Sequence, residues 1–130
     1  MLFRSADLGE HTVTYSFVPH EHGIDTVIPE AYRMEYPAEK VNGSCELDTP
    51  FVTAEGLCVE TVKPAEDGRG IIVRLYNPQN RSFETVVKTA PVLGLTSCKK
   101  VDLLENTVEE LALEPKLQVG PYEIVSLKFE

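Results

Sequence analysis

A chain of 130 residues with 12 Lys plus Arg against 21 Asp plus Glu has a formal net charge of −9, and its basic residues are scattered along the sequence. Such a charge distribution disfavours nucleic acid and anionic membranes as partners. No stretch approaches the ~18 apolar residues that a membrane span requires. Three cysteines without CxxC spacing indicate neither a disulfide framework nor a zinc site, so we expect a cytoplasmic protein with reduced thiols.

The first 40 residues contain one predicted strand and one predicted helix. Residues 11–19 (HTVTYSFVP) alternate large apolar side chains with hydroxyl side chains, which is the period of a half-buried strand. The apolar spacing in 25–34 favours a short helix, with Asp25 or Thr26 as its cap. Pro29 is tolerated there only in the first turn, because its ring removes a backbone donor.

A polar segment at 37–49, with Asn42-Gly43 as a turn signal, separates this opening from a run of short strands, and we divide the chain into 1–40 and 41–130. The predicted strands are 51–54, 57–63, 70–76, 82–89, 96–103, 109–113, 116–119 and 122–129. Connections this short favour antiparallel neighbours over crossovers through helices. The predicted fold class is therefore all-β, an antiparallel β-sandwich.

The strand predicted at 70–76 is apolar on nearly both faces, which indicates a central position in a sheet. Arg74 interrupts that pattern. A guanidinium in a half-buried strand requires a carboxylate partner. The candidates are Glu60, Glu66 and Asp102, or a docking surface on a part of the protein outside this sequence.

The cluster His20-Glu21-His22 has ligand types that bind metal ions, but a metal site needs three or four converging ligands. His11 lies across a full strand length and would not converge with them. Hydrogen-bonded loop histidines are the favoured interpretation.

Glu66 and Asp67 are adjacent carboxylates, and glycoside hydrolysis uses a pair. Catalytic pairs flank the bond at about 5 Å or about 6.5 to 9.5 Å, whereas neighbours in a turn point apart. We therefore expect Asp67 to organise a turn by bonding backbone amides near Gly68. The short motif Gly68-Arg69-Gly70 also favours a hairpin turn over a phosphate site, and no serine or cysteine nucleophile motif is present.

Four ordered segments carry a resemblance to a known family. They are ETVKPAEDGRGIIVRLY at 60–76, which contains two of the family's motifs, VDLLEN at 101–106, GPYEIVSLKF at 120–129, and an opening match at 6–20. Together they resemble the C-terminal region of glycoside hydrolase family 38 α-mannosidases. The residues that match the family motifs, all in structural roles, are Asp7, Gly9, His11, Tyr15, Pro19, His20, Lys63, Ala65, Glu66, Asp67, Arg74, Tyr76 and Glu105.

Several positions depart from the family pattern. Asn77 stands where a glutamate is usual after RLY, Pro64 replaces a Lys-like position, and Gly120-Pro121 substitutes for Lys-Pro. These are loop and edge positions, so the fold is unaffected. They do put in doubt any ion pair inherited at position 77.

The resemblance implies that 1–40 is the end of a larger, mutarotase-like β-sandwich and that 41–130 is a small terminal β-sandwich. It also implies a retaining α-mannosidase whose catalytic carboxylates and divalent metal, commonly zinc, belong to a barrel outside this sequence. We therefore expect no catalytic, cofactor or metal residue in this chain, and expect the fragment to be inactive alone. Its expected partners are the rest of the α-mannosidase chain, an α-mannoside in the intact enzyme, and further copies through open edges.

Two other functions stay open. A carbohydrate-binding module is the first alternative, since small β-sandwiches can bind sugars, although the chain has no Trp. A structural interaction domain unrelated to sugar enzymes is the second, and it would require the ordered motifs to coincide by chance.

Overall fold

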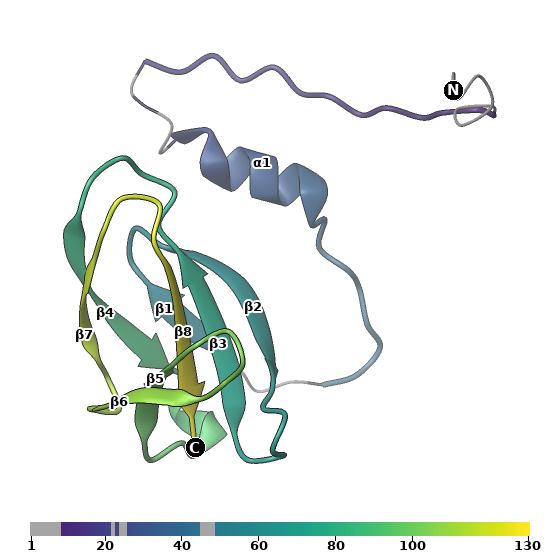
Figure 1. Ribbon diagram of the computed structural model, residues 1–130. Helices are drawn as coiled ribbons and strands as arrows, with labels where there is room; N and C mark the ends of the chain where they lie inside the picture. The colour runs from purple at the N-terminus through teal and green to yellow at the C-terminus, as the bar shows by residue number, and fades with distance from the viewer. Residues whose placement is uncertain (1–8, 22, 24–25, 45–48) are drawn as a thin grey trace, which may run out of the picture. The chain divides into compact units, whose positions relative to one another are not determined.

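The computed structural model describes residues 9–21, 23, 26–44 and 49–130 (Figure 1). It divides into two compact units, Met1–Glu39 and Lys40–Glu130, which we describe separately. The assignment of 1–40 to the end of a larger sandwich stays a prediction. Asp7, His22, Asp25 and Cys45 lie outside the described residues, so the expectations for them stay predictions.

The predicted helix forms as α1, Ile28–Glu35. Pro29 lies in its first turn, as predicted. The predicted cap is wrong within the described residues, because the residue at the N-cap is Val27 and it makes no side-chain cap hydrogen bond. Thr26 instead donates from Oγ1 to the carbonyl oxygen of Gly23 at 3.4 Å.

The predicted strand at 11–19 is not observed. This segment is described, but it carries no strand assignment, and none of the described strands pairs with it. Val13, Tyr15 and Phe17 are 80%, 87% and 88% exposed. Alternating side chains suit a strand, but a strand also requires a neighbour to complete its hydrogen bonds, and the described chain provides none.

The second unit is an antiparallel β-sandwich of two sheets (Figure 1). Its strands are β1 Val52–Ala54, β2 Cys58–Pro64, β3 Ile71–Tyr76, β4 Phe83–Thr89, β5 Cys98–Val101, β6 Thr107–Leu111, β7 Lys116–Val119 and β8 Ile124–Phe129. One sheet has the order β1-β4-β7 and the other β2-β3-β8-β5-β6. All eight predicted strands and the predicted fold class are confirmed, and only their ends differ.

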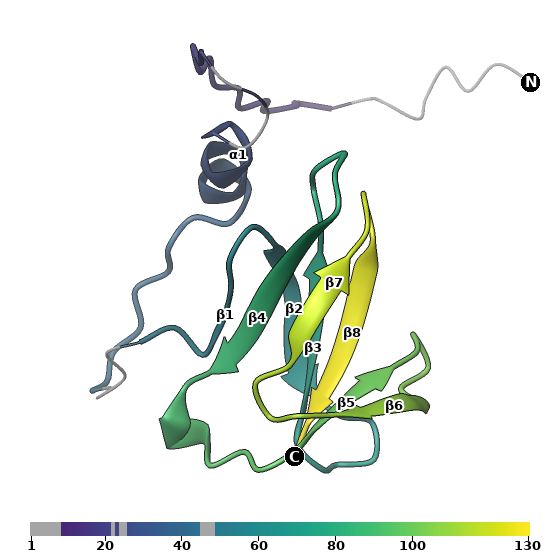
Figure 2. The same cartoon turned by 90° about the vertical axis from the view of Figure 1, so that its left-hand side faces the viewer.

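The two sheets pack face to face around one apolar core (Figure 2). Strands β3 and β8 supply its centre, because Val73, Leu75, Leu127 and Phe129 have no measurable exposure. Shortening a side chain in such a core costs about 2 to 5 kcal/mol through lost burial and the cavity left behind. The core therefore holds the two layers together.

Strand β3 pairs with β2 on one side and β8 on the other, which confirms its predicted central position. Its outward-facing Ile72 is also fully buried. Together with Ala65 and Val101 it forms a second, small apolar cluster. A buried cluster on the outer face of a sheet requires other residues to cover it.

The hairpin between β2 and β3 turns at Ala65 to Gly70. Gly68 donates its N–H to the carbonyl oxygen of Ala65 at 2.9 Å, and Arg69 donates its N–H to Oδ1 of Asp67 at 3.0 Å. The turn role predicted for Asp67 is therefore confirmed. Gly68 and Gly70 both have φ of 73°, a left-handed conformation that favours glycine.

Gly70→Ala is expected to lower the free energy of unfolding by about 3 kcal/mol or more, because it adds a clash to the left-handed strain. A Cβ on Gly70 would lie 1.9 Å from the carbonyl oxygen of Phe129. Gly68→Ala is the matched control, since the same φ applies but no atom lies within 4 Å of its Cβ. The control should cost only about 1 kcal/mol in urea unfolding. Equal losses would contradict the close approach.

Candidate functional site

The loop between β5 and β6, residues 102–106, is organised by one carboxylate. Oδ1 of Asp102 accepts N–H bonds from Leu104 at 2.8 Å and Asn106 at 2.9 Å, and Oδ2 accepts from the Asn106 amide at 3.0 Å. The Asn106 side chain and these backbone donors hold the pKa of Asp102 below its usual value. The loop is thus a fixed structure, although it lies on the surface.

Glu105 fastens this loop to the β2–β3 hairpin. Its Oε1 lies 2.5 Å from Nζ of Lys63, and its Oε2 accepts the backbone N–H of Glu66 at 2.8 Å. The loop therefore crosses the outer face of the five-stranded sheet (Figure 1). Ile72, Ala65 and Val101 form the apolar cluster buried on that face. Glu105 holds a left-handed φ of 66° in doing so, which is unfavourable for a residue with a Cβ.

The charges of this contact reinforce each other. The Lys63 ammonium lowers the pKa of Glu105, and Glu105 raises the pKa of Lys63, with a second contribution from Glu66 at 2.9 Å. Only 11% of the Glu105 side chain is exposed, so the pair is partly shielded from solvent. Two family motifs that are 42 residues apart in sequence are thereby joined.

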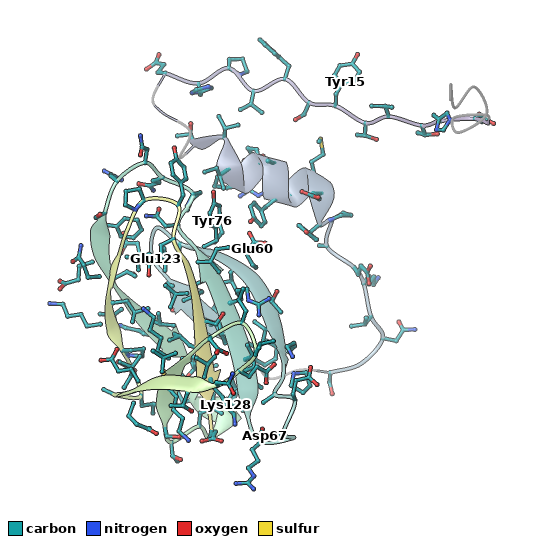
Figure 3. All side chains as sticks on the ribbon, viewed as in Figure 1. Tyr15, Glu60, Asp67, Tyr76, Glu123 and Lys128 are labelled. Carbon is teal, nitrogen blue, oxygen red and sulfur yellow. The ribbon has the colours of Figure 1, made fainter. Side chains whose placement is uncertain are left out.

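A second group of charges gathers around Lys128, whose side chain is 9% exposed. Its Nζ lies 2.7 Å from Asp67 and 2.9 Å from Glu130 (Figure 3). Glu130 also pairs with Lys99 at 2.7 Å. Lys128 lowers the pKa of Asp67, and Asp67 raises the pKa of Lys128. Asp67 thus ties its turn to the last strand.

Arg74 does not pair with a carboxylate within the described residues. Its Nε donates to Oγ of Ser126 at 3.3 Å, a hydrogen bond between β3 and β8. Two of the three predicted carboxylate partners are wrong, because Glu66 binds Lys63 and Asp102 binds its own loop. The third, Glu60, is not among the described contacts of Arg74. The remaining guanidinium N–H donors of this half-buried side chain are available to a partner.

The structure brings together only some of the predicted family-motif residues. Lys63, Ala65, Glu66, Asp67 and Glu105 meet at the hairpin and the loop. Arg74 and Tyr76 lie further along β3. Five other motif residues belong to the first unit: Gly9, His11, Tyr15, Pro19 and His20. The functional assignment of these residues stays a prediction.

Lys128 was not among the predicted motif residues, and Asn77 was noted only as a departure from the motif. Asn77 is fully buried and its amide donates to the carbonyl oxygens of Arg81 at 2.9 Å and Gly120 at 2.6 Å. Its Oδ1 accepts the N–H of Gln79 at 2.9 Å. Asn77, which replaces the glutamate usual at this position, is therefore a buried neutral hub that joins two loops by hydrogen bonds. Its described contacts include no ion pair.

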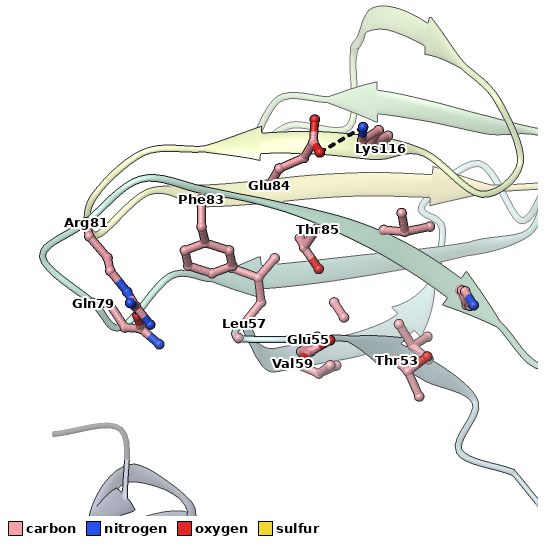
Figure 4. Close-up of a pocket in the computed structure, with 15 residues that line it drawn as sticks. Thr53, Glu55, Leu57, Val59, Gln79, Arg81, Phe83, Glu84, Thr85 and Lys116 are labelled. Atoms are coloured by element: carbon pink, nitrogen blue, oxygen red, sulfur yellow. Dashed lines mark hydrogen bonds and ion pairs between the residues drawn. The ribbon is translucent and has the colours of Figure 1, made fainter. Parts of the chain in front are cut away.

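A groove of about 990 Å³ lies at the three-stranded sheet and the β1–β2 turn (Figure 4). Arg81 and Gln79 lie at one end, and Phe83 lies beside Leu57 in its middle. A Cβ on Gly56 would lie 2.8 Å from the Phe83 ring, so one edge of this ring packs against the turn. Converging acids are not seen, and Glu84, the acid on β4, pairs with a lysine of β7 at 2.7 Å.

The donor set for a metal ion is also not found. Across the described ranges no three His, Cys, Asp or Glu side chains are grouped so that they could bind one. These residues therefore do not fit the divalent ion that the family resemblance implies.

No helix in the described part of the chain is long and apolar enough to cross a membrane.

This geometry defines a class: a small antiparallel β-sandwich whose motif residues make structural contacts within the fold. The family model described as the glycosyl hydrolases family 38 C-terminal beta sandwich domain matches residues 56–127. The chain therefore belongs to glycoside hydrolase family 38, and this part is its C-terminal β-sandwich domain.

Three longer proteins are similar to this chain. The chain is 31% identical over 140 residues to Alpha-mannosidase 2C1 of Mus musculus and 24% identical over 139 residues to Alpha-mannosidase G of Dictyostelium discoideum. These alignments cover 95% and 96% of this chain but 13% of each relative. A Putative mannosylglycerate hydrolase of Halalkalibacterium halodurans is 35% identical over 79 residues, 60% of this chain and 8% of that protein. No solved structure matches.

Glu105→Gln is expected to lower the unfolding midpoint above pH 5, because it removes the charge that holds Lys63. The folded pKa of Glu105 is lowered, so its stabilisation is present above the ordinary value of 4.5 and is lost as the pH falls below it. The difference between the variant and the unaltered chain should therefore close in acid. Glu109→Gln, an exposed glutamate on β6, is the control. A pH-independent difference would contradict the ion pair.

Asn77→Asp is expected to cost about 3 kcal/mol at neutral pH, because a buried carboxylate would face two carbonyl oxygens that now accept hydrogen bonds. The shape of the side chain is preserved, so packing is not the cause. The loss should shrink in acid, where a protonated carboxyl donates again. Asn80→Asp, at an exposed position beside it, should be nearly neutral in the same urea titration. Equal effects at the two positions would refute the hub.

Proposed function

We propose that this chain is the non-catalytic C-terminal part of an α-mannosidase that hydrolyses terminal α-D-mannosides with retention, and that its sandwich supports the catalytic part. The match of residues 56–127 to the family's terminal domain carries this proposal. Two of the relatives are named α-mannosidases, and this chain corresponds to about an eighth of their length. Residues that position catalytic groups need a rigid scaffold, which a packed terminal domain supplies.

The state of the motif carboxylates supports a structural role. A general acid of a glycosidase needs a raised pKa, and its partner carboxylate must flank the substrate bond. Here the pKa values of Asp67 and Glu105 are lowered by the lysines that bind them. Both side chains are engaged in joining secondary-structure elements, which is the opposite of what proton donation to a leaving group requires.

The divalent metal belongs to the same proposal and would lie in the part of the enzyme outside this sequence. When bound there, such an ion would polarise sugar hydroxyls. The residues described here do not form its site, so no step of the reaction is assigned to them. Their contribution is the stiffness of the domain.

A cytoplasmic location is proposed with the enzyme. Cys98 is a buried free thiol, which suits a reducing compartment. Burial raises the pKa of Cys98 to about 12, so this thiol is protonated and unreactive at neutral pH.

The test replaces the matched C-terminal region of the Mus musculus relative with this chain. Deleting that region should reduce hydrolysis of an aryl α-mannoside by at least about tenfold, and the graft should restore it, because lost support misplaces catalytic groups. A graft carrying Ile72→Asp, which buries a charge in the outer cluster, should not restore activity. Full activity after deletion, or turnover by the purified 130 residues alone, would refute the proposal.

A further inference from the structure

The outer face of the five-stranded sheet has a surface that the fold itself leaves uncovered. We call it the Arg74 face and define it by Arg74, Tyr76, Ile124, Leu103 and Leu104. Arg74 and Tyr76 are half-buried, whereas Ile124, Leu103 and Leu104 are 56%, 68% and 82% exposed. It thus combines one cation with several apolar side chains.

The strand register makes this surface continuous. Arg74 on β3 lies opposite Ser126 on β8, which lies opposite Val101 on β5, so these residues form one row across the sheet. Tyr76 lies opposite Ile124 in the next row on the same face. The loop with the two leucines starts directly after Val101 and folds over this face, because Glu105 reaches Lys63 on β2.

Within the described chain, the side-chain contact of Arg74 at the centre of this face is with Ser126. Ser126 accepts from Nε of Arg74, which leaves the N–H donors on Nη1 and Nη2. A guanidinium binds a carboxylate through two parallel hydrogen bonds. In a chain of net charge −9, a half-buried arginine without a carboxylate is complementary to an acidic group on a partner.

The leucines are held in place as well. Asp102 accepts three hydrogen bonds within the loop, and Glu105 anchors its far end. Because the loop is already ordered, it loses little conformational entropy when a partner covers Leu103 and Leu104. Exposed apolar side chains on a preorganised loop are typical of an interface.

We propose that the Arg74 face docks onto an apolar surface with a carboxylate that belongs to the remainder of the longer mannosidase polypeptide. The proposal rests on the proposed function. The length of polypeptide outside this sequence supports this occupant, since the two named α-mannosidase relatives are matched over only 13% of their length. The carboxylate binds Arg74, and the apolar surface covers Leu103, Leu104 and Ile124.

The test uses the graft described above with a specific protease site inserted between Gly43 and Ser44. After cleavage the sandwich should stay bound and co-elute with the catalytic part in gel filtration. Arg74→Met keeps the apolar stem but removes the donors, and it should raise the dissociation constant about tenfold or more. Leu104→Ser should raise the dissociation constant as well. The dissociation constant of Arg74→Lys should lie between that of Arg74→Met and that of the unaltered chain.

Two controls separate docking from folding. Lys88→Met removes an exposed cation from the other sheet and should leave the dissociation constant unchanged. The unfolding midpoints of the isolated Arg74→Met and Leu104→Ser chains should equal that of the unaltered chain. Release of the unaltered sandwich on cleavage, or binding of Arg74→Met as tight as that of the unaltered sandwich, would overturn the docking face. Full mannosidase activity after the bound sandwich is stripped away would instead overturn the proposed function alone.

Discussion

The contact of Glu105 with Lys63 and the backbone of Glu66 is the constraint on which the outer half of the sandwich depends. A β-sandwich needs only its inner faces to fold, and its outer faces ordinarily meet water. Here Ile72 is buried on an outer face, and burial requires a cover. Glu105, whose backbone has a left-handed conformation, holds the loop in position as that cover through its carboxylate.

This constraint explains why charged residues of the family motifs lie together in the described part of this domain. Lys63, Glu66, Asp67 and Glu105 bind the β2–β3 hairpin to the β5–β6 loop and to β8. Charged residues in recurrent positions suggest chemistry at first sight. Their lowered carboxylate pKa values and their lysine partners instead indicate a joint between elements that are distant in sequence.

The fold could be predicted from local pattern, because alternation and turn residues are properties of neighbouring positions. The eight strands and the turn at Asp67 were accessible in this way. The strand at 11–19 failed because alternation describes side chains and says nothing about whether a partner strand is present. Pairs such as Lys63 with Glu105 could not be predicted, since 42 residues separate them and only the loop's return across the sheet brings them together. The contacts of Lys128 could not be predicted either, because in the sequence it is an ordinary polar residue of a strand.

The order of strands in the larger sheet also determines when the domain can be completed during synthesis. Strand β8 lies between β3 and β5, yet it follows both in the sequence. A ribosome therefore delivers the two flanking strands before the one that separates them. Until β8 emerges, β3 and β5 each have an unpaired edge that another nascent chain could extend, and the growing polypeptide must be shielded through that interval.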